Sequence, residues 1–176
     1  MPTIGIGGAG SGVGKTLFAE MLLGQLPGWG ALKYTRTDLY TSVTEDEAVL
    51  KAPGKDTARL LAAGAAKVIW VQSPGGEELE EALSSAMGAL AGLPGVVIEG
   101  NSAVEVLKPD IVIFIGGTEV KKSAHRVLDM ARIVYYPHGA GAPEAGGADN
   151  RNANAFYSVD GQKCLKEVLD ILNGRT

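Results

Sequence analysis

Short, unbroken runs of apolar residues, separated by helical patterns, constrain the fold of this chain more than any other feature. The runs GVVIE at Gly95–Glu99 and DIVIFI at Asp110–Ile115 show no alternation of polar and apolar residues. Such strands are buried on both faces, which is typical of a parallel sheet covered by helices on each side. The other expected strands are Thr3–Gly7, Ala31–Tyr34, Lys67–Val71 and Arg132–Tyr136. Because strands and helices alternate, we expect an α/β fold with a doubly wound, mostly parallel sheet.

The segments between these strands carry apolar residues at helical spacing. A helix is expected from Lys15 to Leu26, closed by Pro27 and Gly28. Further helices are expected over Asp56–Gly64, Glu77–Leu90, Ser123–Met130 and Asp160–Leu172, with Asp56 as a helix cap. Two stretches are predicted to be loops that are mobile without ligand: residues 36–53, which are polar and acidic, and residues 139–155, which hold ten Gly or Ala in seventeen.

Length and composition narrow the class of protein. With 176 residues, 45% of them hydrophobic, the chain is long enough for one domain over residues 1–176 with a real core. A net charge of −4 argues against nucleic acid as a partner. The single Cys164 excludes an intramolecular disulfide and a zinc site of several thiolates. No apolar run reaches the about 18 residues of a membrane span, so we expect a cytoplasmic protein without a membrane partner.

The segment Ala9–Thr16, AGSGVGKT, is the site that carries chemistry. It matches the phosphate-binding spacing G/A-x-x-x-x-G-K-S/T, and Ala9 stands at the first position, which is usually glycine. Its glycines let backbone N–H groups approach a polyphosphate, and the following helix points its N-terminus at the anion. The expected nucleotide-binding residues are Gly10, Ser11, Gly12, Val13, Gly14, Lys15 and Thr16. Lys15 is expected to reach the β- and γ-phosphates and Thr16 to ligate Mg²⁺, which predicts a P-loop NTPase fold that binds GTP or ATP.

Two acidic residues near strand ends are candidates for the metal and for catalysis. Glu99 ends an apolar strand at the edge of the sheet where the phosphates are expected. Asp38 follows the second strand at the same edge, and its alternative interpretation is an ordinary loop acid. Asp110 begins its strand and is therefore expected at the far edge. We assign catalytic roles to Lys15, Glu99 and Asp38, and metal binding to Thr16, Glu99 and Asp38. His125, His138, Cys164 and the pair Lys121-Lys122 are interpreted as structural or solvated, although lysines after the fifth strand can also contact a purine.

Beyond the phosphate loop, the order of several short motifs resembles a known family. The chain has KYTRTD at Lys33–Asp38, PGKDT at Pro53–Thr57, AGA at Ala63–Ala65 and then Glu99-Gly100. This order is similar to the molybdopterin-guanine dinucleotide biosynthesis protein B family, small GTP-binding accessory proteins of molybdenum cofactor assembly. The resemblance covers about residues 3–100 and implies a molybdopterin nucleotidyltransferase or a molybdopterin ligand as partner. The chain differs in lacking the family's histidines before Asp38 and in having Asn101-Ser102 after the Glu-Gly pair.

The motif and the resemblance together predict a slow Mg²⁺-dependent hydrolase of GTP or ATP that acts in molybdenum cofactor biosynthesis. No Asn-Lys-x-Asp guanine motif follows the strand ending at Ile115, where Gly116–Glu119 stands, so the residues leave the base open. One alternative is a small-molecule kinase or ATP-dependent ligase, in which residues 36–53 and 139–155 close over an acceptor. Another is a nucleotide-gated interaction module without turnover. The oligomeric state is also open, with a homodimer as one option.

Overall fold

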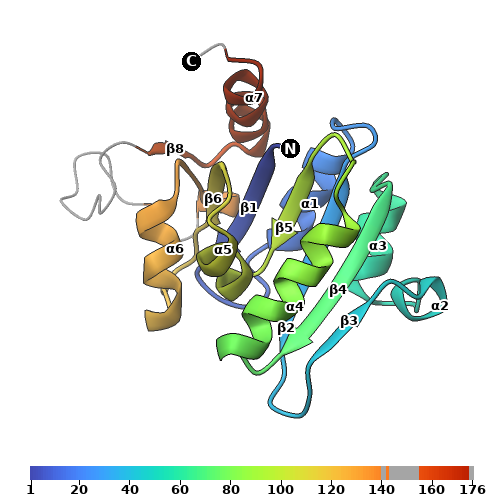
Figure 1. Cartoon of the computed structure of the whole chain (residues 1–176). Helices are drawn as coiled ribbons and strands as arrows, with labels where there is room; N and C mark the ends of the chain where they lie inside the picture. Colours follow the sequence, from blue (N-terminus) through green and yellow to red (C-terminus); the bar gives the residue numbers. More distant parts are fainter. Residues whose placement is uncertain (140–141, 143–154, 175–176) are drawn as a thin grey trace.

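The computed structural model describes residues 1–139, 142 and 155–174 and is built on one sheet (Figure 1). Eight strands lie in the order β3-β4-β2-β5-β1-β6-β7-β8. Their bounds are β1 Thr3–Gly8, β2 Gly30–Arg36, β3 Ser42–Thr44, β4 Lys67–Ser73, β5 Val96–Glu99, β6 Ile111–Ile115, β7 Ile133–Tyr135 and β8 Phe156–Ser158. All neighbouring pairs are parallel except β3 with β4, which is antiparallel. The expected mostly parallel α/β sheet is confirmed.

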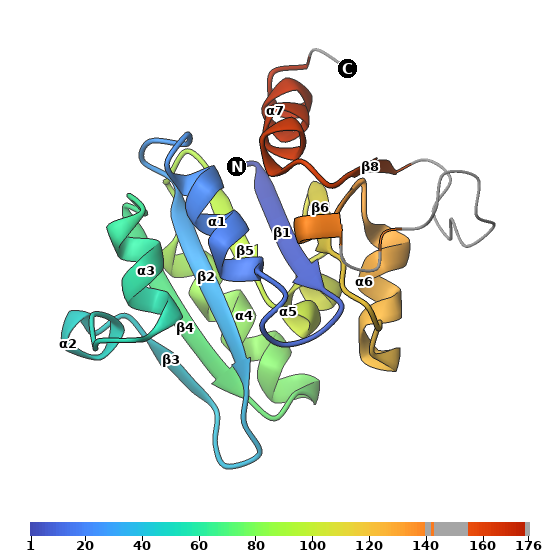
Figure 2. The same ribbon diagram turned by 180° about the vertical axis from the view of Figure 1, so that it is seen from behind.

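Helices cover both faces of the sheet, as Figure 2 shows for the side of α1. One apolar core lies between the sheet and α1 (Lys15–Leu23), α3 (Asp56–Ala62) and α7 (Gly161–Leu172). The second core lies under α4 (Gly76–Ala89), α5 (Asn101–Leu107) and α6 (His125–Met130). Alternate residues of each strand enter opposite cores, so that Ile98 faces one and Val97 the other. This explains why the strands read as unbroken apolar runs.

One row of residues across the sheet departs from this apolar rule and defines the functional face. In the strand register, Glu99 lies opposite Ile6 on one side and Lys33 on the other, and Lys33 lies opposite Trp70. All four stand on the face covered by α1 and α3, near the carboxyl ends of the parallel strands. Two charged side chains, Glu99 and Lys33, therefore sit on a sheet face that is otherwise largely apolar.

Several expected boundaries differ from the structure. Residues 36–53 are not one irregular loop, because Ser42–Thr44 pairs with β4 and α2 spans Glu47–Leu50, capped by Asp46. Short polar segments of this kind become regular only through such tertiary and capping bonds. Sequence patterns also missed α5 and β8, and Asp56 is the first residue of α3 rather than its cap. The first helix ends at Leu23 instead of Leu26. Most of the predicted loop 139–155 lies outside the described residues.

Candidate functional site: a phosphate loop beside a buried charge cluster

The loop between β1 and α1 has the backbone that phosphate binding requires. Gly12 and Gly14 adopt φ of 74° and 101°, a left-handed region that favours glycine. A Cβ added to Gly8 would lie 2.8 Å from the Val13 side chain, so the turn leaves no room for a larger residue. Lys15 Nζ donates to the Gly10 carbonyl at 2.6 Å. Burial is the main cause that lowers the pKa of Lys15, and the negative charge of Glu99 opposes it only in part.

Neighbouring strands anchor the start of this loop. The Ala9 N–H donates to the Ile115 carbonyl at 2.9 Å, and the Lys121 N–H donates to the Ala9 carbonyl at 3.1 Å. The side-chain amide of Asn101 binds Gly8 twice: its Oδ1 accepts from the Gly8 N–H at 2.8 Å and its Nδ2 donates to the Gly8 carbonyl at 3.0 Å. Asn101 is the first residue of α5, directly after β5 and Gly100. The sequence pattern contained no functional signal for it, because the bonds of its side chain to Gly8 depend on how α5 docks against the loop.

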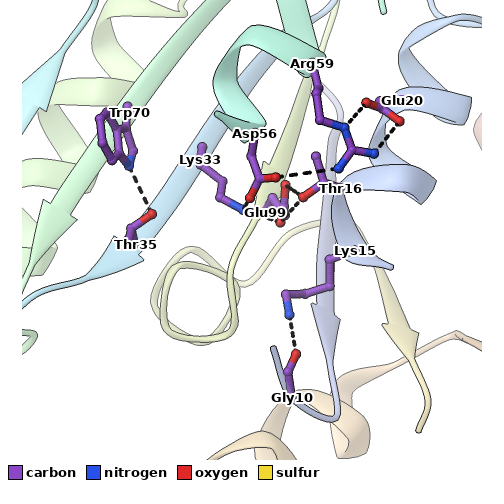
Figure 3. A network of polar contacts seen from close by, with 10 residues as sticks. All are labelled: Gly10, Lys15, Thr16, Glu20, Lys33, Thr35, Asp56, Arg59, Trp70 and Glu99. Atoms are coloured by element: carbon purple, nitrogen blue, oxygen red, sulfur yellow. Dashed lines mark hydrogen bonds and ion pairs between the residues drawn. The ribbon is translucent and has the colours of Figure 1, made fainter. Parts of the chain in front are cut away.

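Thr16 and Glu99 meet at the foot of the loop, as expected from the sequence. The Thr16 hydroxyl lies 3.0 and 3.1 Å from the two carboxylate oxygens of Glu99 and donates to that carboxylate. Glu99 is 1% exposed, so its charge requires compensation. Lys33 provides it, with Nζ 2.5 Å from Glu99 Oε1 and 2.7 Å from Asp56 Oδ2 (Figure 3).

Asp56 and Arg59 extend this cluster from β2 to α3 and α1. Burial alone would raise the pKa of the Asp56 carboxyl, but the hydrogen bond and charge of Lys33 outweigh it and hold the pKa below its usual value. Arg59 binds Glu20 of α1 in a bidentate pair at 2.6 and 2.9 Å, and its Nη1 lies 3.7 Å from Asp56 Oδ1. The sequence offered a signal for two residues of this cluster: Lys33 stands inside an expected strand, and Asp56 ends the motif PGKD.

The structure does not bring Asp38 into this cluster. Its side chain is 84% exposed and lies 3.6 Å from the Arg36 guanidinium. It follows the end of β2, where the chain leaves the sheet before turning back into β3, and its exposed side chain takes no part in the contacts among Thr16, Lys33 and Glu99. Asp56 occupies the position beside Lys33 that a second carboxylate of the site requires. Asp110 lies at the opposite edge as expected, where its Oδ2 accepts from the Thr3 N–H at 2.8 Å.

A cavity of about 540 Å³ opens between the phosphate loop and the charge cluster. The loop residues Ser11, Gly12, Gly14, Lys15 and Thr16 line one side, and Lys33, Thr35, Asp56, Arg59 and Glu99 are among those on the other. Within the described part of the chain, no group of three His, Cys, Asp or Glu side chains could hold a metal ion, and no helix is long and apolar enough to cross a membrane. Cys164 is fully buried in the core, as its structural interpretation predicted.

Comparisons with known proteins give no family assignment. No protein-family model matches the sequence, and no curated protein matches it. Two solved structures are similar. The signal recognition particle receptor FtsY from Elizabethkingia anophelis is 14% identical with a TM-score of 0.40, covering 80% of this chain and 52% of its own. A plasmid partition protein from Borrelia burgdorferi B31, solved bound to AMPPNP, is 14% identical with a TM-score of 0.41, covering 97% and 82%. This chain thus spans about half the length of the FtsY chain.

The chain's own topology defines its class. A central parallel strand, a glycine loop ending in Gly-Lys-Thr, and a helix that starts at the lysine form the phosphate-binding unit, with Glu99 on the adjacent strand. This is an α/β protein with a P-loop NTPase fold. Since no family model and no curated protein matches, the resemblance to the molybdopterin-guanine dinucleotide biosynthesis protein B family stays a prediction.

Proposed function

We propose that this chain binds a nucleoside triphosphate together with Mg²⁺ and hydrolyses it slowly. The observation that carries the proposal is the contact of the Thr16 hydroxyl with the buried Glu99 carboxylate directly below the phosphate loop. Phosphate-loop proteins place a hydroxyl and a strand-end carboxylate in this relation to hold the metal next to the β- and γ-phosphates.

The residues present fit magnesium and a polyphosphate. The donors at the site are oxygen atoms of Thr16, Glu99 and Asp56, which Mg²⁺ prefers, and no cage of three carboxylates or imidazoles stands among the described residues. This set of few oxygen donors is typical of Mg²⁺ sites in such proteins, in which one or two carboxylates bind the ion together with substrate phosphates and waters. Bound there, the ion would neutralise charge on the phosphate oxygens. Lys15, now on the Gly10 carbonyl, has its ammonium at the loop that would hold those oxygens.

Asp56 is the residue of this chain best placed to orient an attacking water. Its side chain is 42% exposed at the cavity, whereas Glu99 is enclosed. Because Lys33 lowers the pKa of Asp56, the carboxylate is ionised at neutral pH and accepts a hydrogen bond from water, but it is a weak base. A well-oriented water beside a weak base agrees with slow hydrolysis.

Calorimetric titration with ATP and with GTP, each with and without Mg²⁺, tests the proposal. We expect Mg²⁺-dependent binding of at least one of them, followed by slow phosphate release. Absence of binding by both nucleotides to the folded chain would refute it. Binding without any phosphate release would instead favour the nucleotide-gated interaction module.

The finer role that we propose is an accessory function in molybdenum cofactor assembly with GTP as the nucleotide. The residues that carry the resemblance support it, because Asp56 of PGKD and Glu99 of the Glu-Gly pair both contact Lys33 at the site. Titration with a molybdopterin nucleotide, in the presence of the preferred triphosphate, tests this role. If the chain binds neither the pterin nucleotide nor GTP, this role is excluded, whereas the proposal of an ATP site is unaffected.

A further inference from the structure

A second, smaller cavity adjoins the phosphate site on the side of β4. Its volume is about 110 Å³, and it shares Lys33, Thr35 and Asp56 with the larger cavity. It adds Lys55, Thr57 and Trp70 to the lining. Figure 3 shows Trp70 and Thr35 on the far side of Lys33 from Lys15. A ligand in this cavity would therefore lie beside Lys33 and Asp56, on the side away from Lys15 and the phosphate loop.

Lys55 brings an uncompensated positive charge to this second cavity. Its Nζ lies 4.3 Å from the centroid of the Trp70 ring, and among the described residues it forms no ion pair. Lys33, the other cation that lines this second cavity, differs because it contacts the carboxylates of Asp56 and Glu99. An ammonium held only by an aromatic face is available to an anion, since its contact with the ring is weaker than a charge-assisted hydrogen bond.

Thr35 supplies a hydroxyl beside this charge. The Trp70 indole N–H donates to Thr35 Oγ1 at 3.0 Å, which fixes both side chains. Since that bond uses Thr35 as an acceptor, and no hydrogen bond donated by its side chain is found in the described part of the chain, the hydroxyl proton can serve a ligand. A cation and a hydroxyl donor over one small cavity favour an oxyanion.

We propose that this second cavity is the acceptor subsite and binds the carboxylate or phosphate group of a small second substrate through Lys55 and Thr35. A volume of 110 Å³ equals that of about four waters, which admits an oxyanion with a few carbon atoms and excludes a second nucleotide. The assignment as acceptor rests on the proposed triphosphate site. A hydroxyl oxygen of the acceptor would attack the γ-phosphorus and pass its proton to the Asp56 carboxylate, which lines both cavities. The bond from the γ-phosphorus to the β,γ-bridging oxygen would break with its electron pair on that oxygen, giving the phosphorylated acceptor and the nucleoside diphosphate.

Fluorescence of Trp70 reports on the subsite directly. The chain has two tryptophans, so Trp29→Phe leaves Trp70 as the single source of tryptophan emission. Titration with malonate or with inorganic phosphate, at constant ionic strength, is expected to change its emission saturably as the anion draws Lys55 off the ring. Comparing the two anions separates a carboxylate from a phosphate ligand. Since Trp29 is a core residue, calorimetric titration with the same anions is repeated on Lys15→Ala, which keeps Trp29 and lacks the lysine of the phosphate loop.

Substitution at the lysine decides the proposal. Lys55→Gln is expected to weaken anion binding about tenfold or more, the loss of one hydrogen bond from a charged group. Lys51→Gln, which removes an exposed lysine paired with Glu47, is the matched control and should leave anion binding unchanged. No saturable response to either anion, or equal affinity in Lys55→Gln, would overturn the subsite.

The triphosphate site is tested separately. Lys55→Gln should retain Mg²⁺-dependent nucleotide affinity, and Lys15→Ala should retain the anion response of Trp70. A chain that binds nucleotide but gives no anion response in either titration refutes only the acceptor subsite. A chain that gives the anion response but binds no nucleotide refutes the proposed function and, with it, the assignment of this subsite as an acceptor site.

Discussion

Glu99 and Lys33 are paired across β5 and β2, and each makes the burial of the other tolerable. Their side chains are only 2% and 12% exposed, on a sheet face that is otherwise largely apolar. Removing one member of a buried ion pair leaves an unpaired charge and typically costs about 3–5 kcal/mol. Glu99→Gln is an informative substitution at this cluster, because it keeps the shape of the side chain and Lys33 still pairs with Asp56 when the charge of Glu99 is removed.

Lys15→Ala should abolish nucleotide binding and leave the fold intact. Lys15 donates only to a loop carbonyl and does not belong to either apolar core, so its loss removes phosphate contacts rather than packing. Loss of hydrogen bonds from a charged donor predicts at least about 100-fold weaker binding. Calorimetric titration measures it, with circular dichroism as the control for folding. Unchanged nucleotide affinity in a folded Lys15→Ala variant would refute the assignment of this loop to phosphate binding.

Glu99→Gln should retain nucleotide but lose most hydrolysis and Mg²⁺ dependence. The amide keeps the size of the side chain and removes the charge that holds the metal and its hydroxyl ligand, so we expect about 10–100-fold lower turnover at limiting Mg²⁺. Asp38→Asn is the matched control, since Asp38 is exposed and contacts only Arg36 among the ion pairs of the described residues, and the turnover of this variant should be unchanged. Lower turnover in Asp38→Asn with unchanged turnover in Glu99→Gln would instead assign the metal to Asp38 and exclude Glu99 from its binding.

At the scale of elements, α3 is fastened to the sheet and to α1 by charged side chains as well as by its apolar face. Asp56 contacts Lys33 of β2, and Arg59 binds Glu20 of α1. These bonds place α3 along the rim of the cavity, so the helix belongs to the site as much as to the core.

Asp56→Asn should lower the free energy of unfolding at neutral pH, and this loss of stability should disappear at acid pH. The pKa of Asp56 is lowered in the folded state, so its charge stabilises the fold above the unfolded pKa of about 4. This contribution is lost as the pH falls through the lower folded pKa. Urea unfolding of both proteins from pH 7 to pH 2 should show their free energies of unfolding converging below about pH 4. A constant difference over that range would contradict the role of the Lys33–Asp56 pair.

Hydrogen exchange should divide residues 36–53 into two parts. Arg36 lines the large cavity, so we expect triphosphate with Mg²⁺ to slow exchange over residues 36–41. Ser42–Thr44 pairs with β4 and should be protected without ligand as well. Fast exchange over 36–41 in both states would show that this segment does not reach the ligand.

At the scale of the whole molecule, the bound nucleotide would connect α1, β5, β2 and α3, so its binding should stabilise the complete fold. At a ligand concentration 100 times the dissociation constant, linkage adds about 2.7 kcal/mol. For a chain of this size, we expect a rise in Tm of roughly 5–10 °C that requires Mg²⁺ and is absent in Lys15→Ala. Differential scanning calorimetry measures it. An equal rise without Mg²⁺ would mean that the metal does not join the site.

The sequence by itself determined the parts of this protein that depend on local pattern. Unbroken apolar runs such as Gly95–Glu99 marked the parallel strands, because burial on both faces leaves no alternation. The loop Ala9–Thr16 marked the phosphate site, because its backbone conformation needs glycines at fixed spacing. Glu99 could be placed at the edge of the sheet where the phosphates are expected, because parallel strands end at a common edge.

Only the tertiary structure decided which residues complete the site. Asp38 and Asp56 both follow β2 in sequence, but α3 folds back over the sheet and brings Asp56 to Lys33, while Asp38 leaves the edge with the chain. Asn101 meets Gly8, and Trp70 reaches Lys55, across 93 and 15 positions of sequence respectively. β3 likewise exists through its pairing with β4. Contacts of this kind depend on how strands and helices dock, and the residues on either side carry no local pattern that specifies their partner.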